Sequence, residues 1–264
     1  MPRYEPVDWY ETPRWYDLVF AEDTAKEADF LEEAQRRYGR VRAPARPPRV
    51  LEPACGSGRL VEQMARRGWR VTGFDASRAM LDYAARRLER SRLHADLRVA
   101  RLESFRFRER FELAHCLVST FKYLLDERSA RSHLSCVARS LRRGGLYVLG
   151  FHLSDYDWLE CDHERWVARS DGVKVVCNIQ TWPPQTALRR ERVRCRLVVE
   201  EQGRVRRTET TWWFRSYDAA QVRRLLRTVP DLEHVATYDF RYDWTRPRPL
   251  DDRQLDALLI LRRR

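Results

Sequence analysis

The chain has no long hydrophobic run. Its longest apolar stretches, such as Leu146–Leu149 and Ala257–Leu261, are far shorter than the roughly 20 residues that a membrane-spanning helix needs. The first ten residues contain no apolar core of the kind found in a secretory signal. We therefore expect a soluble, cytoplasmic protein without a membrane partner.

The cysteine motifs of structural zinc sites are missing as well. The six cysteines are scattered without a C-x-x-C pair, and Cys161 with His163 has no second pair of ligands to complete a zinc site. A disulfide framework is not expected in a chain of this size and context. The sequence therefore predicts no metal site.

Lysine is scarce, although the chain is strongly basic. Only Lys26, Lys122 and Lys174 are lysines among 51 basic residues, which outnumber the 39 acidic residues and give a formal charge of +12. The arginines are spread over the whole length, often beside Glu or Asp, unlike the clustered stripe of a typical nucleic-acid binder. The charge permits a nucleic-acid partner without requiring one.

Hydrophobic periodicity divides the chain into four parts. Residues 1–44 predict an N-terminal helical lid segment that runs into a proline-rich linker. Residues 45–157 alternate short apolar strands with amphipathic helices, which favours a mostly parallel sheet with helices on both faces. Residues 158–215 alternate with a period of two, which predicts an antiparallel β insertion that turns at Gln202–Gly203. Residues 216–264 predict a helix and strands that complete the core sheet.

The predicted fold is therefore α/β. It has a mostly parallel, seven-stranded sheet with helices on both faces, and the antiparallel insertion follows the fifth strand. Within this frame, Ser77 is expected to cap the helix after the second strand, and Ser216 or Asp218 the helix after the insertion.

The most informative segment follows the first core strand. Residues 50–59 read VLEPACGSGR, a strand that ends in Gly-x-Gly and opens a helix. Glycines without Cβ atoms let backbone N–H groups approach a ligand closely. Asp75 ends the second predicted strand, where a carboxylate can accept hydrogen bonds from both hydroxyls of a ribose. Val61 stands where dinucleotide binders have a third glycine, so the order predicts a nucleoside ligand without a pyrophosphate.

This segment resembles motif I of class I S-adenosylmethionine-dependent methyltransferases, E-x-A-C-G-x-G, which have a Rossmann-like sheet. The likeness covers residues 45–151 well and the final helix and strands more loosely. It implies that S-adenosyl-L-methionine is the cofactor. The resemblance also implies cofactor contacts at the methionine end from Glu52, Ala54, Gly56 and Gly58, at the ribose from Asp75, and at the adenine from Ala76 and Met80.

One position departs from the family pattern. Family members often carry Asp in a segment like A-D-M-x-x-F, where it accepts a hydrogen bond from the adenine amino group, and this chain has Arg101 there. Arginine has no acceptor, so the contact is lost, shifted to Glu103 or taken by backbone. Leu102 can still pack against the adenine ring.

Two more segments resemble parts of the family that lie near the cofactor. Tyr16-Asp17-x-x-Phe20 is similar to the Tyr-Asp-x-x-Tyr lid of many small-molecule members, so Tyr16 is expected to close over the cofactor. The segment CLVSTFKYL follows the fourth strand, and its Leu117 is expected to border the cofactor. Both residues are equally suited to ordinary packing.

The candidate catalytic residues are His152 and Asp155. Both follow the fifth strand, at the edge where open α/β sheets bind their ligands. Either could act as general base or grip the substrate, although a histidine at a strand end is more often a hydrogen-bonded structural residue.

These features predict a methyltransferase that acts on an N or O atom of a small molecule. The insertion is expected to form a substrate lid or a homodimer surface. Aromatic residues expected to line a substrate pocket are Trp9, Trp15, Tyr16, Trp158, Trp166, Trp182, Trp212 and Trp213. Two alternatives stay open. The first is an RNA or protein methyltransferase, which the charge permits, although the chain has no Asn/Asp-Pro-Pro-Tyr/Phe motif after the fourth strand. The second is a non-catalytic cofactor-binding protein, and its main support is Arg101.

Overall fold

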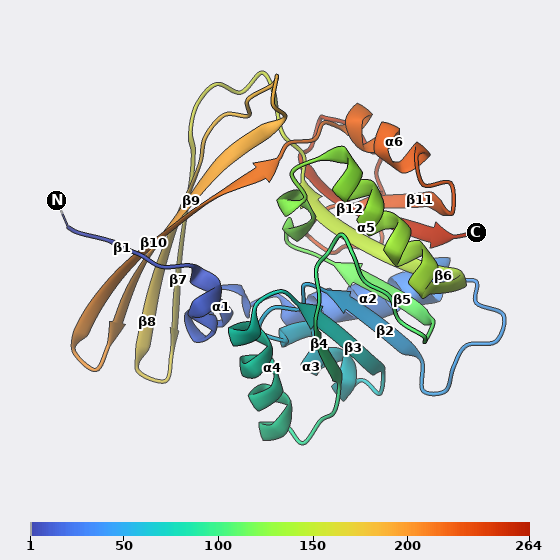
Figure 1. Ribbon diagram of the computed structural model, residues 1–264, viewed down its shortest axis with the longest axis horizontal. Coiled ribbons are helices and arrows are strands. Elements are labelled where there is room, and N and C mark those ends of the chain that lie inside the picture. Colours follow the sequence, from blue (N-terminus) through green and yellow to red (C-terminus); the bar gives the residue numbers. More distant parts are fainter. Residues whose placement is uncertain (1) are drawn as a thin grey trace.

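The computed structural model describes residues 2–264. Two β-sheets organise the chain: a core sheet sandwiched between helices and a second sheet that stands beside it (Figure 1). Within the described residues, no helix is both long and apolar enough to cross a membrane.

The core sheet has seven strands. In spatial order these are β11 (Leu232–Tyr238), β12 (Asp256–Arg263), β6 (Leu141–His152), β5 (Phe111–Cys116), β2 (Arg49–Pro53), β3 (Arg70–Asp75) and β4 (Asp96–Val99). Neighbours from β6 to β4 pair in parallel. Strand β12 runs antiparallel to both β6 and β11. The predicted α/β fold with a mostly parallel sheet is confirmed.

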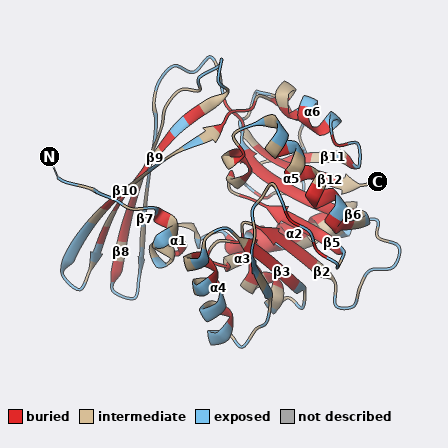
Figure 2. Cartoon of the chain, viewed as in Figure 1, coloured by how far each residue is buried: buried red, intermediate tan, exposed pale blue. Residues whose placement is uncertain are grey.

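Helices cover both faces of the core sheet, and the strand residues between them are buried (Figure 2). One face packs against α5 (Glu127–Ser140) and α6 (Ala219–Arg227), and the other against α2 (Thr24–Tyr38), α3 (Arg59–Arg66) and α4 (Arg78–Arg90). Successive strand residues alternate between the faces, as the pleat requires: Val50 joins one apolar cluster and Leu51 the other.

The helix ends follow local signals that the sequence shows. The Ser77 side chain accepts a hydrogen bond from the backbone N–H of Met80 at the start of α4. Of the two caps considered for α6, Asp218 is the one used, and it forms a reciprocal capping box with Gln221. These interactions satisfy backbone donors that have no partner within the helix.

The second sheet is an antiparallel meander with one added strand. Its four long strands are β7 (Asp162–Ser170), β8 (Val173–Thr181), β9 (Arg190–Glu201) and β10 (Arg204–Arg215), and the last two are joined by the predicted Gln202–Gly203 turn. The added strand, β1 (Glu5–Pro6), pairs in parallel with β10 and was not predicted. The function expected for this sheet, as a lid or dimer surface, stays a prediction.

The N-terminal segment lies on one face of the second sheet. It contains a 3₁₀ turn, η1 (Trp9–Glu11), and helix α1 (Pro13–Phe20). Trp9 is buried in the apolar cluster formed by β8 and β9, and residues of α1 pack against the same cluster. The segment therefore connects the second sheet to the core.

Gly58 combines a left-handed backbone with a close contact. Its φ is +74°, and a Cβ would lie 2.7 Å from Ala84 Cβ on α4. Gly172, at the β7–β8 turn, has a φ of +73° with no atom within 4 Å of an added Cβ.

We expect Gly172→Ala to lower the free energy of unfolding by about 1 kcal/mol, because of the left-handed backbone alone. Gly58→Ala should lower it by about 1–3 kcal/mol more, because the added Cβ overpacks the contact with α4. Urea unfolding measures both, and equal losses would show that the α3–α4 contact can relax.

His115 on β5 is fully buried, and burial lowers its pKa from 6.5 to about 3, assisted by the positive charge of Arg59. Between pH 6.5 and about pH 3, His115 is therefore protonated in the unfolded chain and neutral in the folded chain. Stability should fall by about 1.4 kcal/mol per pH unit in that window from this residue. His115→Gln should reduce the loss of unfolding free energy per pH unit. His94→Gln, at an exposed position, should leave that slope unchanged. Identical slopes in all three proteins would contradict this assignment.

Candidate functional site

The loop after β2 is held by a carboxylate from the next strand. Asp75 accepts hydrogen bonds from the backbone N–H of Gly56 at 2.9 Å and of Ser77 at 2.8 Å. Burial raises the pKa of Asp75, and these N–H groups oppose the rise. A carboxylate has about four acceptor positions, so Asp75 can still accept from a ligand at the sheet edge. It does not point into the hydrophobic interior.

The loop backbone turns sharply between the strand and α3. Ala54, Gly56 and Gly58 all have positive φ angles, of 54°, 52° and 74°. The position of a Gly56 Cβ would lie 3.9 Å from Tyr16 Cε1, so the Tyr16 ring reaches the loop. Tyr16 packs in an aromatic cluster with Trp9, whose ring centroid is 5.2 Å away, and with Tyr10 at 5.6 Å.

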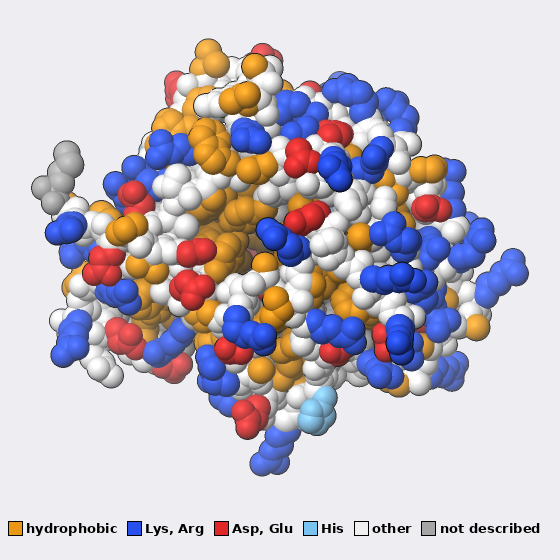
Figure 3. Space-filling model, viewed as in Figure 1, with side chains coloured by type: hydrophobic (Ala, Val, Ile, Leu, Met, Phe, Trp, Pro, Cys, Tyr) orange, Lys and Arg blue, Asp and Glu red, His pale blue; other side chains and the backbone are white. Residues whose placement is uncertain are grey.

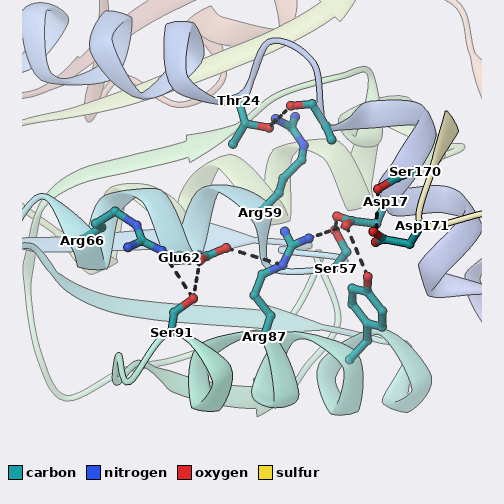
Figure 4. A network of polar contacts seen from close by, with 12 residues as sticks. Asp17, Thr24, Ser57, Arg59, Glu62, Arg66, Arg87, Ser91, Ser170 and Asp171 are labelled. Carbon is teal, nitrogen blue, oxygen red and sulfur yellow. Dashed lines mark hydrogen bonds and ion pairs between the residues drawn. The ribbon is translucent and has the colours of Figure 1, made fainter. Parts of the chain in front are cut away.

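Asp17 on α1 forms polar contacts with the glycine loop and with α4 (Figure 4). Its carboxylate accepts from Ser57 Oγ at 2.7 Å and from Tyr83 OH at 3.3 Å, and it forms an ion pair with Arg87. Asp17 belongs to the Tyr16-Asp17 motif that the sequence shows, but no role was predicted for it. These contacts hold the Tyr16 ring beside Gly56.

Two polar side chains are buried on the neighbouring strands β2 and β5. Glu52 on β2 is 7% exposed, and within the described residues its Oε2 has no hydrogen-bond partner. Burial raises its pKa well above the usual range. On β5, the residue after Ala114, which pairs with Leu51, is His115. Its ring nitrogens also lack partners among residues 2–264. Such groups favour a polar ligand nearby, because unpaired buried polar atoms are costly.

The other residues expected at the cofactor lie around this edge. Ala76 is exposed, Met80 is fully buried and Leu117 is 7% exposed. The loop after β4 lies next to Asp75, because the Ala100 N–H donates to the Asp75 carbonyl at 3.1 Å. In that loop Leu102 packs against the core, while the Glu103 carboxylate pairs with Arg101 Nε at 3.1 Å. Their contacts with a cofactor stay predictions.

A cavity of about 500 Å³ lies between the core and the second sheet. Figure 3 shows hydrophobic side chains gathered around this hollow. Its wall is formed by η2 (Thr120–Tyr123), the segment after β6, the N-terminal aromatic cluster and the second sheet. Tyr16 lines it as well, so the cavity adjoins the glycine loop. The aromatic residues in its wall are Trp9, Tyr10, Tyr16, Phe20, Tyr123, Trp158, Trp166, Trp182, Trp212 and Phe214.

Both candidate catalytic residues, His152 and Asp155, line this cavity. His152 Nδ1 is 2.9 Å from Asp256 Oδ1, and its ring packs edge-on against Phe240. The same contact lowers the pKa of Asp256. Asp155 is exposed and accepts from the backbone N–H of Asp157. Sequence reasoning missed Asp256, because no motif marks it and it lies on the distant strand β12.

A buried ion pair forms part of the cavity wall. Lys122 and Glu191 pair side chain to side chain, with side-chain exposures of 3% and 8%. Lys122 Nζ also donates to the His152 carbonyl at 3.0 Å, and Glu191 Oε2 accepts from Ser154 Oγ at 2.9 Å. The pair joins η2 of the core to β9 of the second sheet.

Comparison with known proteins relates part of the chain to a family. Residues 50–145 match the methyltransferase domain family. A protein of Geobacillus sp. strain WCH70 named as a methyltransferase is 28% identical over 142 residues, which are 52% of this chain and 55% of that protein. The ubiquinone biosynthesis O-methyltransferase of Methylocella silvestris is 31% identical over 37% of each chain. The matched regions thus span about half or less of the length of these curated relatives.

Solved structures resemble the chain over its whole length. Streptomyces venezuelae DesVI has a TM-score of 0.77 at 19% identity and covers 98% of this chain and 99% of its own. A methyltransferase dependent on S-adenosylmethionine from Clostridium acetobutylicum has a TM-score of 0.75 at 16% identity, with coverage of 96% and 98%. At these identities the likeness shows the fold. Residues 50–145 therefore form a methyltransferase domain, and they do so on a fold shared with S-adenosylmethionine-dependent methyltransferases.

Proposed function

We propose that this protein transfers a methyl group from S-adenosyl-L-methionine to an N or O atom of a small molecule. The observation that carries the proposal is the adjacency of the Asp75–glycine-loop edge to an aromatic cavity of about 500 Å³. That volume is typical of a small-molecule site. The proposal draws further support from similar folds named as an amino pentose methyltransferase, CalS10, and a sugar N-methyltransferase, KedS8.

The residues at the sheet edge fit this cofactor. Asp75 retains acceptor capacity for ribose hydroxyls, and Glu52 offers an unpaired buried oxygen for a polar amino-acid tail. The bare backbone at Gly56 admits close approach. Bound there, the cofactor would supply an activated methyl group on a sulfonium. The chain would then hold the acceptor, exclude water and accept a proton.

His152 is suited to accept that proton. When its Nδ1–H donates to Asp256, the neutral ring presents Nε2 as the acceptor. Asp256 would then position the imidazole and stabilise its protonated form. Asp155 lies on the same wall and is proposed to contact the acceptor.

The proposed function is tested by calorimetry and by transfer of labelled methyl groups. We expect the protein to bind S-adenosyl-L-methionine and not NAD, and to methylate members of a panel of amines and phenols. Asp75→Asn should weaken cofactor binding about 10- to 100-fold, the loss expected for hydrogen bonds to a charged acceptor. Asp96→Asn, at the opposite end of the β3–β4 pair, is the control. No cofactor binding by the unchanged protein would overturn the proposal.

The role of His152 has its own test. His152→Gln should lower kcat about 100-fold or more, the usual contribution of a general base, while cofactor affinity stays unchanged. Asp256→Asn should lower kcat less and shift the pH profile, because it acts through His152. An unchanged kcat in His152→Gln would remove the residue from catalysis.

A further inference from the structure

The wall of the cavity is acidic, although the chain carries a net charge of +12. Among the lining residues, the only Lys or Arg is Lys122. The carboxylates that line the cavity are Asp155, Glu160, Asp162, Glu164, Glu191 and Asp256. Since Glu191 neutralises Lys122, no lysine or arginine among the described lining residues compensates the other five carboxylates.

The arginines of the second sheet do not line the cavity because β9 alternates its side chains. Glu191 and Val193 are buried and face inward. Arg192 and Arg194 occupy the intervening positions and stack on Trp182, with guanidinium carbons 4.8 and 5.3 Å from its ring centroid. A phosphate or diphosphate group inside the cavity would therefore meet carboxylates and aromatic rings instead of arginine, its usual partner.

The cavity wall already holds one alkylammonium group. Lys122 Nζ lies 5.5 Å from the ring centroid of Phe214, pairs with Glu191 and donates to a backbone carbonyl. These are the partners that stabilise an ammonium ion away from water: an aromatic face, a carboxylate and a neutral oxygen. The same elements, several aromatic rings and carboxylates, continue around the rest of the wall.

Glu164 on β7 lines the cavity beside Asp162 and Asp256. Its side chain makes no hydrogen bond or ion pair within residues 2–264. Burial raises the pKa of Glu164, as do the nearby charges of Asp162 and Asp256, while His152 lowers it. A cation placed among these three carboxylates would relieve their mutual repulsion.

We infer that the methyl acceptor is a cationic amine without a phosphate group, whose ammonium lies among Asp162, Glu164 and Asp256 and against the aromatic wall. The identification of this ligand as the acceptor rests on the proposed function. An ammonium must lose one proton before its nitrogen lone pair can form a bond to carbon. The N–H bond breaks, the proton passes to His152 Nε2, and the imidazolium stays paired with Asp256.

Two probes of equal shape isolate the contribution of charge. Choline and 3,3-dimethylbutan-1-ol differ only in a quaternary nitrogen in place of a carbon. Binding is measured without cofactor, by calorimetry and by tryptophan fluorescence, so that no transfer occurs. We expect choline to bind about tenfold or more tightly than the alcohol, and the preference to weaken at high salt because exposed carboxylates are screened.

The carboxylates are tested by substitution. The double variant Asp162→Asn/Glu164→Gln should reduce the choline preference to about twofold or less, with an unchanged thermal midpoint. Asp171→Asn is the matched control, because Asp171 lies at the tip of the same β7–β8 hairpin and does not line the cavity. Asparagine also tolerates its left-handed backbone.

The outcomes separate this inference from the proposed function. Equal binding of the two probes, or binding of uridine diphosphate as tight as that of choline, would overturn the charge preference. A protein that binds S-adenosyl-L-methionine and methylates a phenol but shows no choline preference contradicts this inference alone. A protein that prefers choline but binds no cofactor contradicts the proposed function alone and leaves a cation site.

Discussion

The hydrogen bond from the Gly56 N–H to the Asp75 carboxylate connects the ends of two neighbouring parallel strands. Because β2 and β3 run in the same direction and pair residue by residue up to Pro53 and Phe74, their following loops must meet at one edge. The carboxylate accepts from both loops, which orients the glycine turn and leaves its bare backbone beside a charged acceptor. Glu52 lies on β2 just before the glycine loop, and Tyr16 contacts that loop and lines the cavity, so the geometry of this edge sets that of the site.

The enclosure of the site depends on contacts between segments far apart in the chain. Asp17 holds α1 against the glycine loop through Ser57 and Arg87, while β1 joins the second sheet beside β10. Lys122 and Glu191 connect the same sheet to the core from the other side. Breaking one partner of such a buried pair leaves an uncompensated charge, which is strongly destabilising. The two sheets are thus connected both through the N-terminal segment and through this ion pair.

Local sequence patterns predicted the helices, strands and turns well, but they did not predict side-chain pairs between residues far apart in the chain. The strand, glycine loop, helix and terminal Asp75 follow signals within a few residues of each other, as do the Ser77 cap and the Gln202–Gly203 turn. In contrast, Asp256 lies 104 residues from His152 in sequence, and Glu191 lies 69 from Lys122. Neither pairing has a spacing rule, because the fold alone brings the strands together. Strand β1 is only two residues long and has no period to detect.

The sign of the charge in the cavity shows why overall composition misleads about a partner. A strand places successive side chains on opposite faces, so the arginine-rich β9 presents Glu191 and Val193 to the cavity while Arg192 and Arg194 face Trp182. The +12 charge thus describes the molecule's outer surface more than its recognition site. The local charge around the cavity is therefore set by the alternation of a few strands, and it is opposite in sign to the charge of the chain.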